Sequence, residues 1–135
     1  MSDWNSGIIE EFRTNEGIVG GPFEGRTLLL LHTTGRTSGI ERVNPLAYRM
    51  AGEKYAVFGS KGGAPEHPDW IRNVAANPDV EVEVGTDRFK GRAEVLWDGA
   101  EHDEIYAAQV ADWPQFGEYQ EKVERTIPVV LIERI

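Results

Sequence analysis

The sequence predicts a mainly β, α+β protein whose strands form a small antiparallel barrel or half-barrel. Apolar or alternating runs give about six strand candidates, at residues 27–32, 42–50, 54–59, 80–84, 88–96 and 127–132. Sequential hairpins dominate and only one connection is long and helical, which excludes a doubly wound parallel sheet. Six strands of this length are expected to curl up, because closure removes free sheet edges. Short helices should flank the barrel.

Composition narrows the function classes. A chain of 135 residues suggests one domain. With 14 Lys and Arg against 23 Asp and Glu, the net charge of −9 argues against nucleic-acid binding. The absence of cysteine excludes disulfides, thiolate chemistry and iron–sulfur clusters. The start lacks signal-peptide regions and the longest apolar run covers only residues 28–31, so a cytoplasmic location is expected.

The N-terminal segment has its own pattern. Residues 5–15 predict an amphipathic helix with Ile8, Ile9 and Phe12 on one face. We expect that face to dock on the core; the alternatives are a lid or a peripheral membrane contact, and the acidic Glu10 and Glu11 oppose an anionic membrane. Residues 15–25 hold four glycines and one proline and predict a loop.

Two glycine-bearing loops follow neighbouring strands. The first covers residues 33–39 after a strand expected to be buried on both faces, and it carries Arg36. In the next strand Pro45 indicates an edge position or a bulge, because proline cannot donate to the ladder. The second loop, residues 58–65, pairs Lys61 with adjacent glycines, whose backbone N–H groups can form an anion nest or simply make a turn. Loops two strands apart share an end of an antiparallel sheet, so Arg36 and Lys61 are expected to form one anion site.

The second half alternates short helices and strands. A helix at 67–76 precedes a hairpin in which Glu81 and Glu83 should face water. Asp98 is expected to cap a helix over residues 98–111, a shorter helix over 116–125 follows, and the last strand closes the sheet. The three histidines share no metal-ligand spacing, so no metal site is predicted, and His102 should be exposed in its acidic helix.

These motifs resemble the deazaflavin-dependent (F420-dependent) nitroreductase family from residue 27 onward. The segments that carry the resemblance are TTGRTSG (33–39), RVNPL (42–46), GSKGGAP (59–65), PDWIRNVAANP (68–78), PQFGEYQ (114–120) and IPVV (127–130). The resemblance implies a split β-barrel, related to flavin-binding (FMN-binding-like) barrels, over residues 27–135, preceded by a helix and loop over 1–26. It implies an oxidoreductase that transfers hydride from reduced coenzyme F420 to a quinone, nitroaromatic or enone.

The resemblance also assigns residues to the coenzyme. Arg36, Arg42 and Lys61 would bind its anionic tail, because guanidinium groups hold phosphate and carboxylate well. The other expected coenzyme contacts are Thr34, Thr37, Ser38, Gly39, Asn44, Pro45, Leu46, Ser60, Gly62, Gly63, Trp70 and Asn73.

Tyr48, Ser60 and Tyr119 are the catalytic candidates, since a hydroxyl can orient an acceptor oxygen or relay a proton. The tyrosines could instead only pack their rings, and Ser60 could only cap a turn. Two alternative functions stay open: a reductase that binds FMN in the same barrel, and a carrier that binds F420 or a flavin without turnover. The expected partner is a small-molecule electron acceptor, and the four tryptophans make a homodimer plausible.

Overall fold

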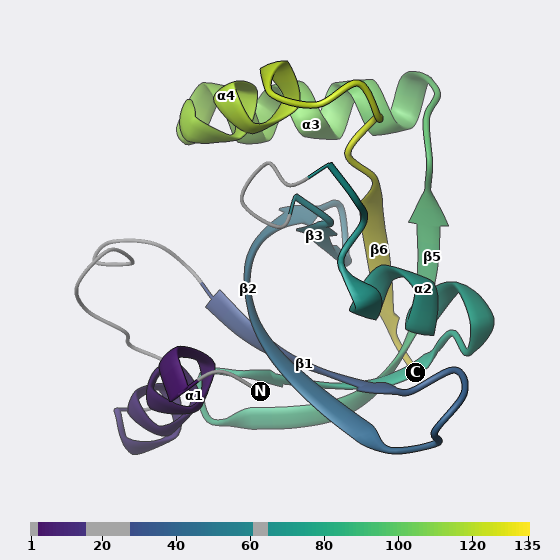
Figure 1. Cartoon of the computed structure of the whole chain (residues 1–135). Coiled ribbons are helices and arrows are strands. Elements are labelled where there is room, and N and C mark those ends of the chain that lie inside the picture. Colours follow the sequence, from purple (N-terminus) through teal and green to yellow (C-terminus); the bar gives the residue numbers. More distant parts are fainter. Residues whose placement is uncertain (1–2, 16–27, 61–64) are drawn as a thin grey trace.

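The computed structural model describes residues 3–15, 28–60 and 65–135 and shows a closed antiparallel barrel in the order β1-β2-β3-β6-β5-β4 (Figure 1). The six strands are β1 (Leu28–Thr34), β2 (Glu41–Ala51), β3 (Lys54–Phe58), β4 (Asp79–Val84), β5 (Asp87–Leu96) and β6 (Val129–Arg134). The helices are α1 (Asp3–Thr14), α2 (Asp69–Ala76), α3 (Ala100–Asp112) and α4 (Gln115–Glu121). The predicted fold class and element order are confirmed.

Hairpins between sequential strands build most of the barrel. β1 pairs with β2, β2 with β3 and β4 with β5, all antiparallel. Gly52 lies in the β2–β3 turn at φ 66°, a conformation that glycine adopts without a Cβ clash. Pairing of β1 with β4, and of β6 with both β3 and β5, closes the barrel, so that each described strand pairs with two others.

Three hydrophobic clusters pack against the barrel wall, one inside the barrel and two outside it. The cluster inside the barrel includes Leu29 and Leu31 of β1 and is completed by Trp70, Ile71 and Val74 of α2. A second cluster lies under α3 and α4, at the top of Figure 1. Leu28 and Leu30 point to the opposite face of β1 and pack against α1. β1 is therefore buried on both faces, as predicted.

Among the described strands, β2 pairs with only one neighbour at any point along its length. Residues 41–47 pair with β1, whereas only residues 48–51 pair with β3. Among the described strands, the first half of β2 therefore has one open edge. Pro45 lies in this half, which agrees with the predicted edge position.

Helix α1 docks on the barrel. It begins at Asp3, two residues before the predicted start. Ile8 and Phe12 are buried against Leu28 and Leu30, so the expected docking face is confirmed and the apolar residues that a membrane contact would need are already covered. None of the helices in the described ranges is long and apolar enough to cross a bilayer.

Two local predictions were wrong. Helix α3 begins at Ala100 with Gly99 at its N-cap and no side-chain cap bond, so Asp98 does not cap it. Gly99, at φ 104°, occupies the N-cap position, so Asp98 lies one residue too early in the chain to serve as the N-cap. Glu83 does not face open water, because α1 covers it and Arg13 Nη2 lies 2.7 Å from its Oε2. The predicted loop 15–25, beyond Asn15, and the boundary at residue 26 lie outside the described residues.

Candidate functional site

The turn between β1 and β2 is fixed to helix α2. The Arg36 backbone N–H and Nη1 both donate to Asn73 Oδ1, at 3.1 and 2.9 Å. Arg36 Nη2 lies 3.8 Å from Asp69 Oδ1 at the start of the same helix. Asn73 is 4% exposed, so its amide is a buried anchor rather than a surface group. The guanidinium of Arg36 is held in one place, while its side chain stays about one-third exposed (35%).

The turn itself is closed by local hydrogen bonds. Ser38 Oγ accepts from the Ile40 backbone N–H at 3.1 Å, and Gly39 N–H donates to the Gly35 carbonyl. Gly39 has φ 70°, in the left-handed region that favours glycine. Thr37 is exposed in this turn and Thr34 ends β1 just before it. These residues build a compact polar loop beside Arg36.

The candidates on β2 alternate between two faces. Leu46 and Tyr48 pack against the cluster inside the barrel, and Val43 and Ala47 pack toward α1. The β1–β2 register is continuous, so Arg42 and Asn44 share the inner face with Leu46 and Tyr48. Pro45 belongs to the other face. The structure therefore brings Arg42, Asn44 and Leu46 into one row and leaves Pro45 out of it.

An orphan hydroxyl lies opposite Arg42. Thr33 pairs with Arg42 in the register and is 2% exposed. Its Oγ1 is buried and has no hydrogen-bond partner in the part of the chain that the structure describes. A buried polar atom without a partner costs free energy, so this hydroxyl next to an arginine is a place for a bound acceptor group. Thr33 was not among the predicted site residues, although its motif was.

The chain that follows β3 is held by Arg125. Its Nη1 donates to the Gly59 carbonyl and the His67 Nδ1, at 3.1 and 2.9 Å, and its Nη2 donates to the Ser60 carbonyl at 3.0 Å. Burial, Arg125 and Arg72 lower the pKa of His67, so the ring is neutral and accepts from the guanidinium at neutral pH. Arg125 fixes both ends of the predicted Ser-Lys-Gly-Gly loop, while Lys61, Gly62 and Gly63 themselves lie outside the described residues.

The two candidate tyrosines lie in different clusters. Tyr48 packs inside the barrel, with its ring centroid 5.6 Å from that of Tyr55. Tyr119 on α4 packs 5.3 Å from Phe116 in the cluster under α3 and α4. Burial raises the pKa of both phenols, helped by Tyr55 at Tyr48 and by Glu118 at Tyr119, so both keep their proton at neutral pH. The described contacts do not bring the two hydroxyls together.

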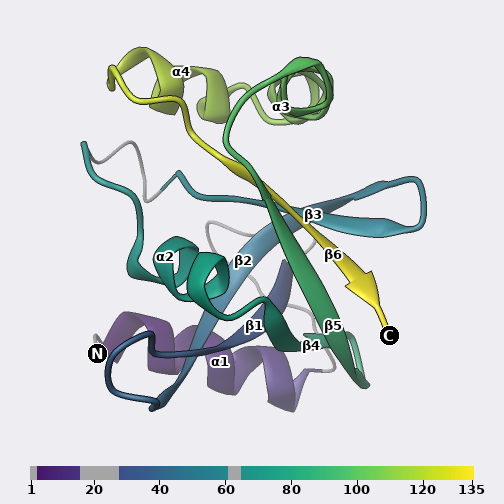
Figure 2. The ribbon, with the colours of Figure 1, turned by 90° about the vertical axis from the view of Figure 1, so that its right-hand side faces the viewer.

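The remaining candidates surround α2. Trp70 is 4% exposed and completes the barrel core. The β1–β2 turn and the chain after β3 lie on the same side of the barrel as α2 (Figure 2). Helix α2 contacts the turn through Asn73. It also approaches Gly59 after β3, where an added Cβ would lie 2.7 Å from Ile71 Cδ1. The predicted combination of Arg36 with Lys61 stays a prediction. Arg36 contacts α2 through Asn73, and Arg72 and Arg125 lie near His67, so basic groups lie on two sides of α2 in a chain of net charge −9. Guanidinium groups suit phosphate and carboxylate.

In the site region, one prediction from the sequence was wrong and one contributing residue was not predicted. His102 is 4% exposed, and its Nε2 lies 2.7 Å from the Ile127 carbonyl, so the prediction of an exposed histidine was wrong. Its spacing with Ile105, Tyr106 and Gln109, which are also buried, is the signal of one helix face. Arg125 had no local signal, because its partners lie 58–66 residues away in the sequence.

Comparison with known proteins adds independent observations. A family model described as F420H(2)-dependent quinone reductase matches residues 7–134. The F420H(2)-dependent quinone reductase Rv1261c of Mycobacterium tuberculosis is 37% identical over 129 residues, which cover 91% of this chain and 85% of that protein.

Solved structures give the same picture. One described as an F420-H2 dependent reductase (FDR-A) is 40% identical with a TM-score of 0.71, over 78% of this chain and 93% of that one. Another, described as a domain-swapped dimer, is 35% identical with a TM-score of 0.73, over 97% and 98% of the two chains. A pyridoxamine 5′-phosphate oxidase-related, FMN-binding protein of Nostoc punctiforme is 15% identical with a TM-score of 0.55, over 100% of this chain and 82% of that one, and shows the shared barrel fold alone.

Proposed function

The chain belongs to the F420H(2)-dependent quinone reductase family, and from this premise we propose how its residues hold the coenzyme and the acceptor. It is an oxidoreductase that uses reduced coenzyme F420 and passes hydride to an acceptor of the quinone kind. The bound deazaflavin supplies the redox chemistry, so the task of the protein is to bind, orient and shield it.

The anchoring of Arg36 on Asn73 carries the assignment of the tail site. An arginine that is fixed by a buried amide and still partly exposed is preorganised to bind an anion, because it loses little side-chain entropy on binding. Arg42 adds a second guanidinium on the inner face of β2 and has no ion-pair partner among the described residues. Thr33, whose Oγ1 is unpartnered in the same part of the chain, is its register partner on β1. We assign the phosphate and carboxylates of the coenzyme tail to these groups, together with Lys61.

The inner face of β2 is the proposed place of the ring. Asn44 and Leu46 lie between Arg42 and Tyr48 on that face, in the half of β2 that pairs with β1 and has no described partner on its other edge. Leu46 offers an apolar surface and Asn44 a hydrogen-bonding amide. The Tyr48 phenol, which keeps its proton at neutral pH, can donate to an acceptor oxygen. Ser60 and Tyr119 stay predictions for the same step, and Trp70 supports α2 from the core rather than from the surface.

Assembly and location are part of the proposal. A homodimer is supported by the domain-swapped dimer among the similar structures. A cytoplasmic location stays a prediction. The membrane contact proposed for the N-terminal helix has no support, because its apolar side chains Ile8 and Phe12 are buried on the barrel.

Coenzyme binding by the purified full chain tests the proposal. We expect fluorescence titration to show micromolar or tighter binding of F420 and much weaker binding of FMN, followed by oxidation of the reduced coenzyme when a quinone is added. Preference for FMN would overturn the tail assignment, and tight F420 binding without turnover would favour the carrier alternative.

Two substitutions test where the anionic tail of the coenzyme binds. Arg36→Ala and Lys61→Ala should each weaken F420 binding by roughly 1–3 kcal/mol, the range for a charge-assisted contact. Arg92→Ala is the matched control, because this β5 arginine is 64% exposed and lies 3.6 Å from Asp79. An unchanged affinity for Arg36→Ala, or an equal loss for Arg92→Ala, would remove the β1–β2 turn from the site.

A further inference from the structure

A buried histidine on the outer face of the barrel meets three carboxylates from two neighbouring strands. His32 of β1 is 4% exposed. Its Nε2 lies 2.5 Å from Glu83 Oε2 on β4, and its Nδ1 lies 3.3 Å from Glu41 Oε1 on β2. Ligand atoms of His32, Glu41 and Glu81 all lie within 4.8 Å of one another. The cluster lies on the α1 face of the wall, since His32 alternates with Leu28 and Leu30.

The hydrogen bond to Glu83 fixes the imidazole tautomer. A carboxylate only accepts, so the Nε2 proton of His32 points to Glu83, and Arg13 in turn binds Glu83 through two hydrogen bonds of 2.7 and 3.1 Å. Nδ1 then carries the lone pair. Histidines that bind metals are usually held in this way by a carboxylate on the second ring nitrogen.

The free lone pair faces an oxygen that also accepts. Nδ1 of His32 is buried without a hydrogen-bond partner in the described part of the chain, although Glu41 Oε1 is 3.3 Å away. A charge-assisted N–H···O⁻ bond would be shorter, about 2.7–2.9 Å. In contrast, neighbouring ligands of a tetrahedral zinc ion with bonds of about 2.0–2.1 Å lie about 3.3–3.4 Å apart. The spacing suits a shared cation better than a shared proton.

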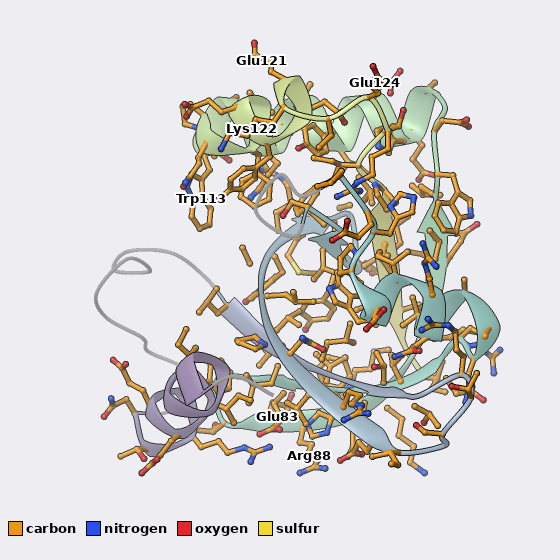
Figure 3. The ribbon with its side chains drawn as sticks, viewed as in Figure 1. Glu83, Arg88, Trp113, Glu121, Lys122 and Glu124 are labelled. Carbon is orange, nitrogen blue, oxygen red and sulfur yellow. The ribbon has the colours of Figure 1, made fainter. Side chains whose placement is uncertain are left out.

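The surroundings can complete such a site. His32, Glu41 and Glu81 line a groove of about 390 Å³, which offers space for water ligands. Two carboxylates balance one dication. Arg88 binds both oxygens of Glu81, at 2.6 and 3.1 Å, which leaves lone pairs on that carboxylate for a metal. Glu83 and Arg88 are register partners on β4 and β5, and Figure 3 shows them at the lower edge of the barrel, to the right of α1.

We propose that His32 Nδ1, Glu41 and Glu81 bind a zinc-like first-row divalent cation that ties β1, β2 and β4 together. Imidazole with carboxylates suits zinc and its neighbours, whereas magnesium prefers oxygen ligands alone. Sequence spacing did not show the site, because each ligand comes from a different strand. The three ligands lie on the outer face of the wall, whereas Arg42, Asn44 and Leu46 lie on the inner face of β2. Thr33 and Thr34 line the same groove as the ligands, but the proposed cation does not depend on hydride transfer.

Calorimetric titration of chelator-treated full-length protein with Zn²⁺ tests the proposal. We expect one equivalent to bind, at least tenfold weaker binding in Glu41→Gln, and no change in Glu53→Gln. Glu41 has a 59% exposed side chain, so its substitution should not unfold the protein, and Glu53 is an exposed glutamate in the β2–β3 turn. Mg²⁺ should bind much more weakly than Zn²⁺.

Nitrogen NMR of the histidine rings gives a second readout that general carboxylate binding would not move. Zn²⁺ should shift the Nδ1 signal of His32 and leave that of His67 unchanged. Equal zinc affinity in both glutamine variants, binding without a His32 shift, or equal binding of Mg²⁺ would each overturn the proposal.

Discussion

Arg125 is the residue that joins the C-terminal segment to the proposed coenzyme loop. Its guanidinium binds two consecutive backbone carbonyls and a histidine ring, three acceptors in a fixed fork. Burial lowers its pKa, but the guanidinium keeps its charge at neutral pH. The role proposed for it is positional, because it touches the backbone at Gly59 and Ser60 on one side of the loop and His67 beyond the other.

Replacing Arg125 with lysine tests this role. An ammonium group cannot reach all three acceptors at once, so Arg125→Lys should weaken F420 binding roughly tenfold, the equivalent of about 1.4 kcal/mol. F420 titration and thermal unfolding should be measured together. Arg92→Lys is the matched control, since Arg92 is exposed. Unchanged coenzyme affinity in Arg125→Lys, with the same or a lower Tm, would contradict the positioning role.

At the scale of single residues, the sequence predicted residue types for the site but not the contacts between them. Arg36, in a loop of glycines and hydroxyls, predicted an anion site from residue type alone, whereas Asn73 was expected as a coenzyme contact only through the family resemblance. Their mutual hydrogen bond, across 37 residues, could not be read from the chain. The burial of Glu83 is similar: strand alternation put it correctly on the outer face, but only the docking of α1 covers that face.

At the scale of elements, β3 and α2 approach one another at a glycine. A Cβ built on Gly59 would lie 2.7 Å from Ile71 Cδ1 and Cγ1 and 3.0 Å from Pro128 Cγ. Ile71 is fully buried, so it cannot rotate into free space. The absence of a side chain at Gly59 therefore sets the spacing between the strand and the helix that carries Asn73.

Gly59→Ala should destabilise the fold by roughly 1–3 kcal/mol, the usual cost of overpacking. It should also weaken F420 binding, because α2 must move away from β3. Denaturant unfolding and F420 titration measure both effects. Gly7→Ala is the control: nothing lies within 4 Å of its added Cβ, and alanine favours helix α1 by about 0.5–1 kcal/mol. A neutral Gly59→Ala would show that the junction has room.

Helix α1 is held by its apolar face. Phe12 is 1% exposed and packs with Ile8, Leu28 and Leu30. Phe12→Ala should therefore reduce the free energy of unfolding by about 3–5 kcal/mol, while Glu10→Ala on the exposed face should change it by no more than about 0.5 kcal/mol. Urea unfolding of both variants provides the comparison. Equal stabilities would mean that α1 does not dock in solution.

In the whole barrel, the pairs between strands that follow one another in the sequence could be predicted. Alternation over Val80–Val84 and Phe89–Val95, with turn residues between, fixed the β4–β5 hairpin and its buried face. Closure depends on pairs such as Leu31 with Val82 and Ala56 with Leu131, which are far apart in the chain. The prediction of a barrel came from the general cost of open edges and from the family resemblance, and the exact closing pairs had no local signal.

The charge balance of the whole molecule separates global from local effects of pH. With a net charge of −9, the folded chain repels itself at neutral pH, and mild acid relieves this repulsion. Glu83 responds in the opposite direction. Burial raises its pKa, but hydrogen bonds from Arg13 and His32 outweigh burial and lower the pKa below its ordinary value.

The linkage between folding and Glu83 ionisation gives the direction in which the contribution of Glu83 to stability changes with pH. Because the folded-state pKa is below the unfolded one, the carboxylate stabilises the fold above the unfolded value of about 4.3, and that stabilisation is lost as pH falls through the folded pKa. At pH 7, Glu83→Gln should cost about 1.5–3 kcal/mol, the range for hydrogen bonds to charged groups. The difference between wild type and variant should shrink below about pH 4.3.

Unfolding of wild type, Glu83→Gln and Glu94→Gln between pH 3 and pH 8 separates the two effects. Each protein carries nearly the same net charge, so relief of repulsion cancels in the differences and only the local contribution remains. Glu94 is exposed on β5 and serves as the control, for which the difference from wild type should stay small across the range. A Glu83→Gln difference that stayed constant down to pH 3 would mean that Arg13 and His32 do not bind the Glu83 carboxylate in solution.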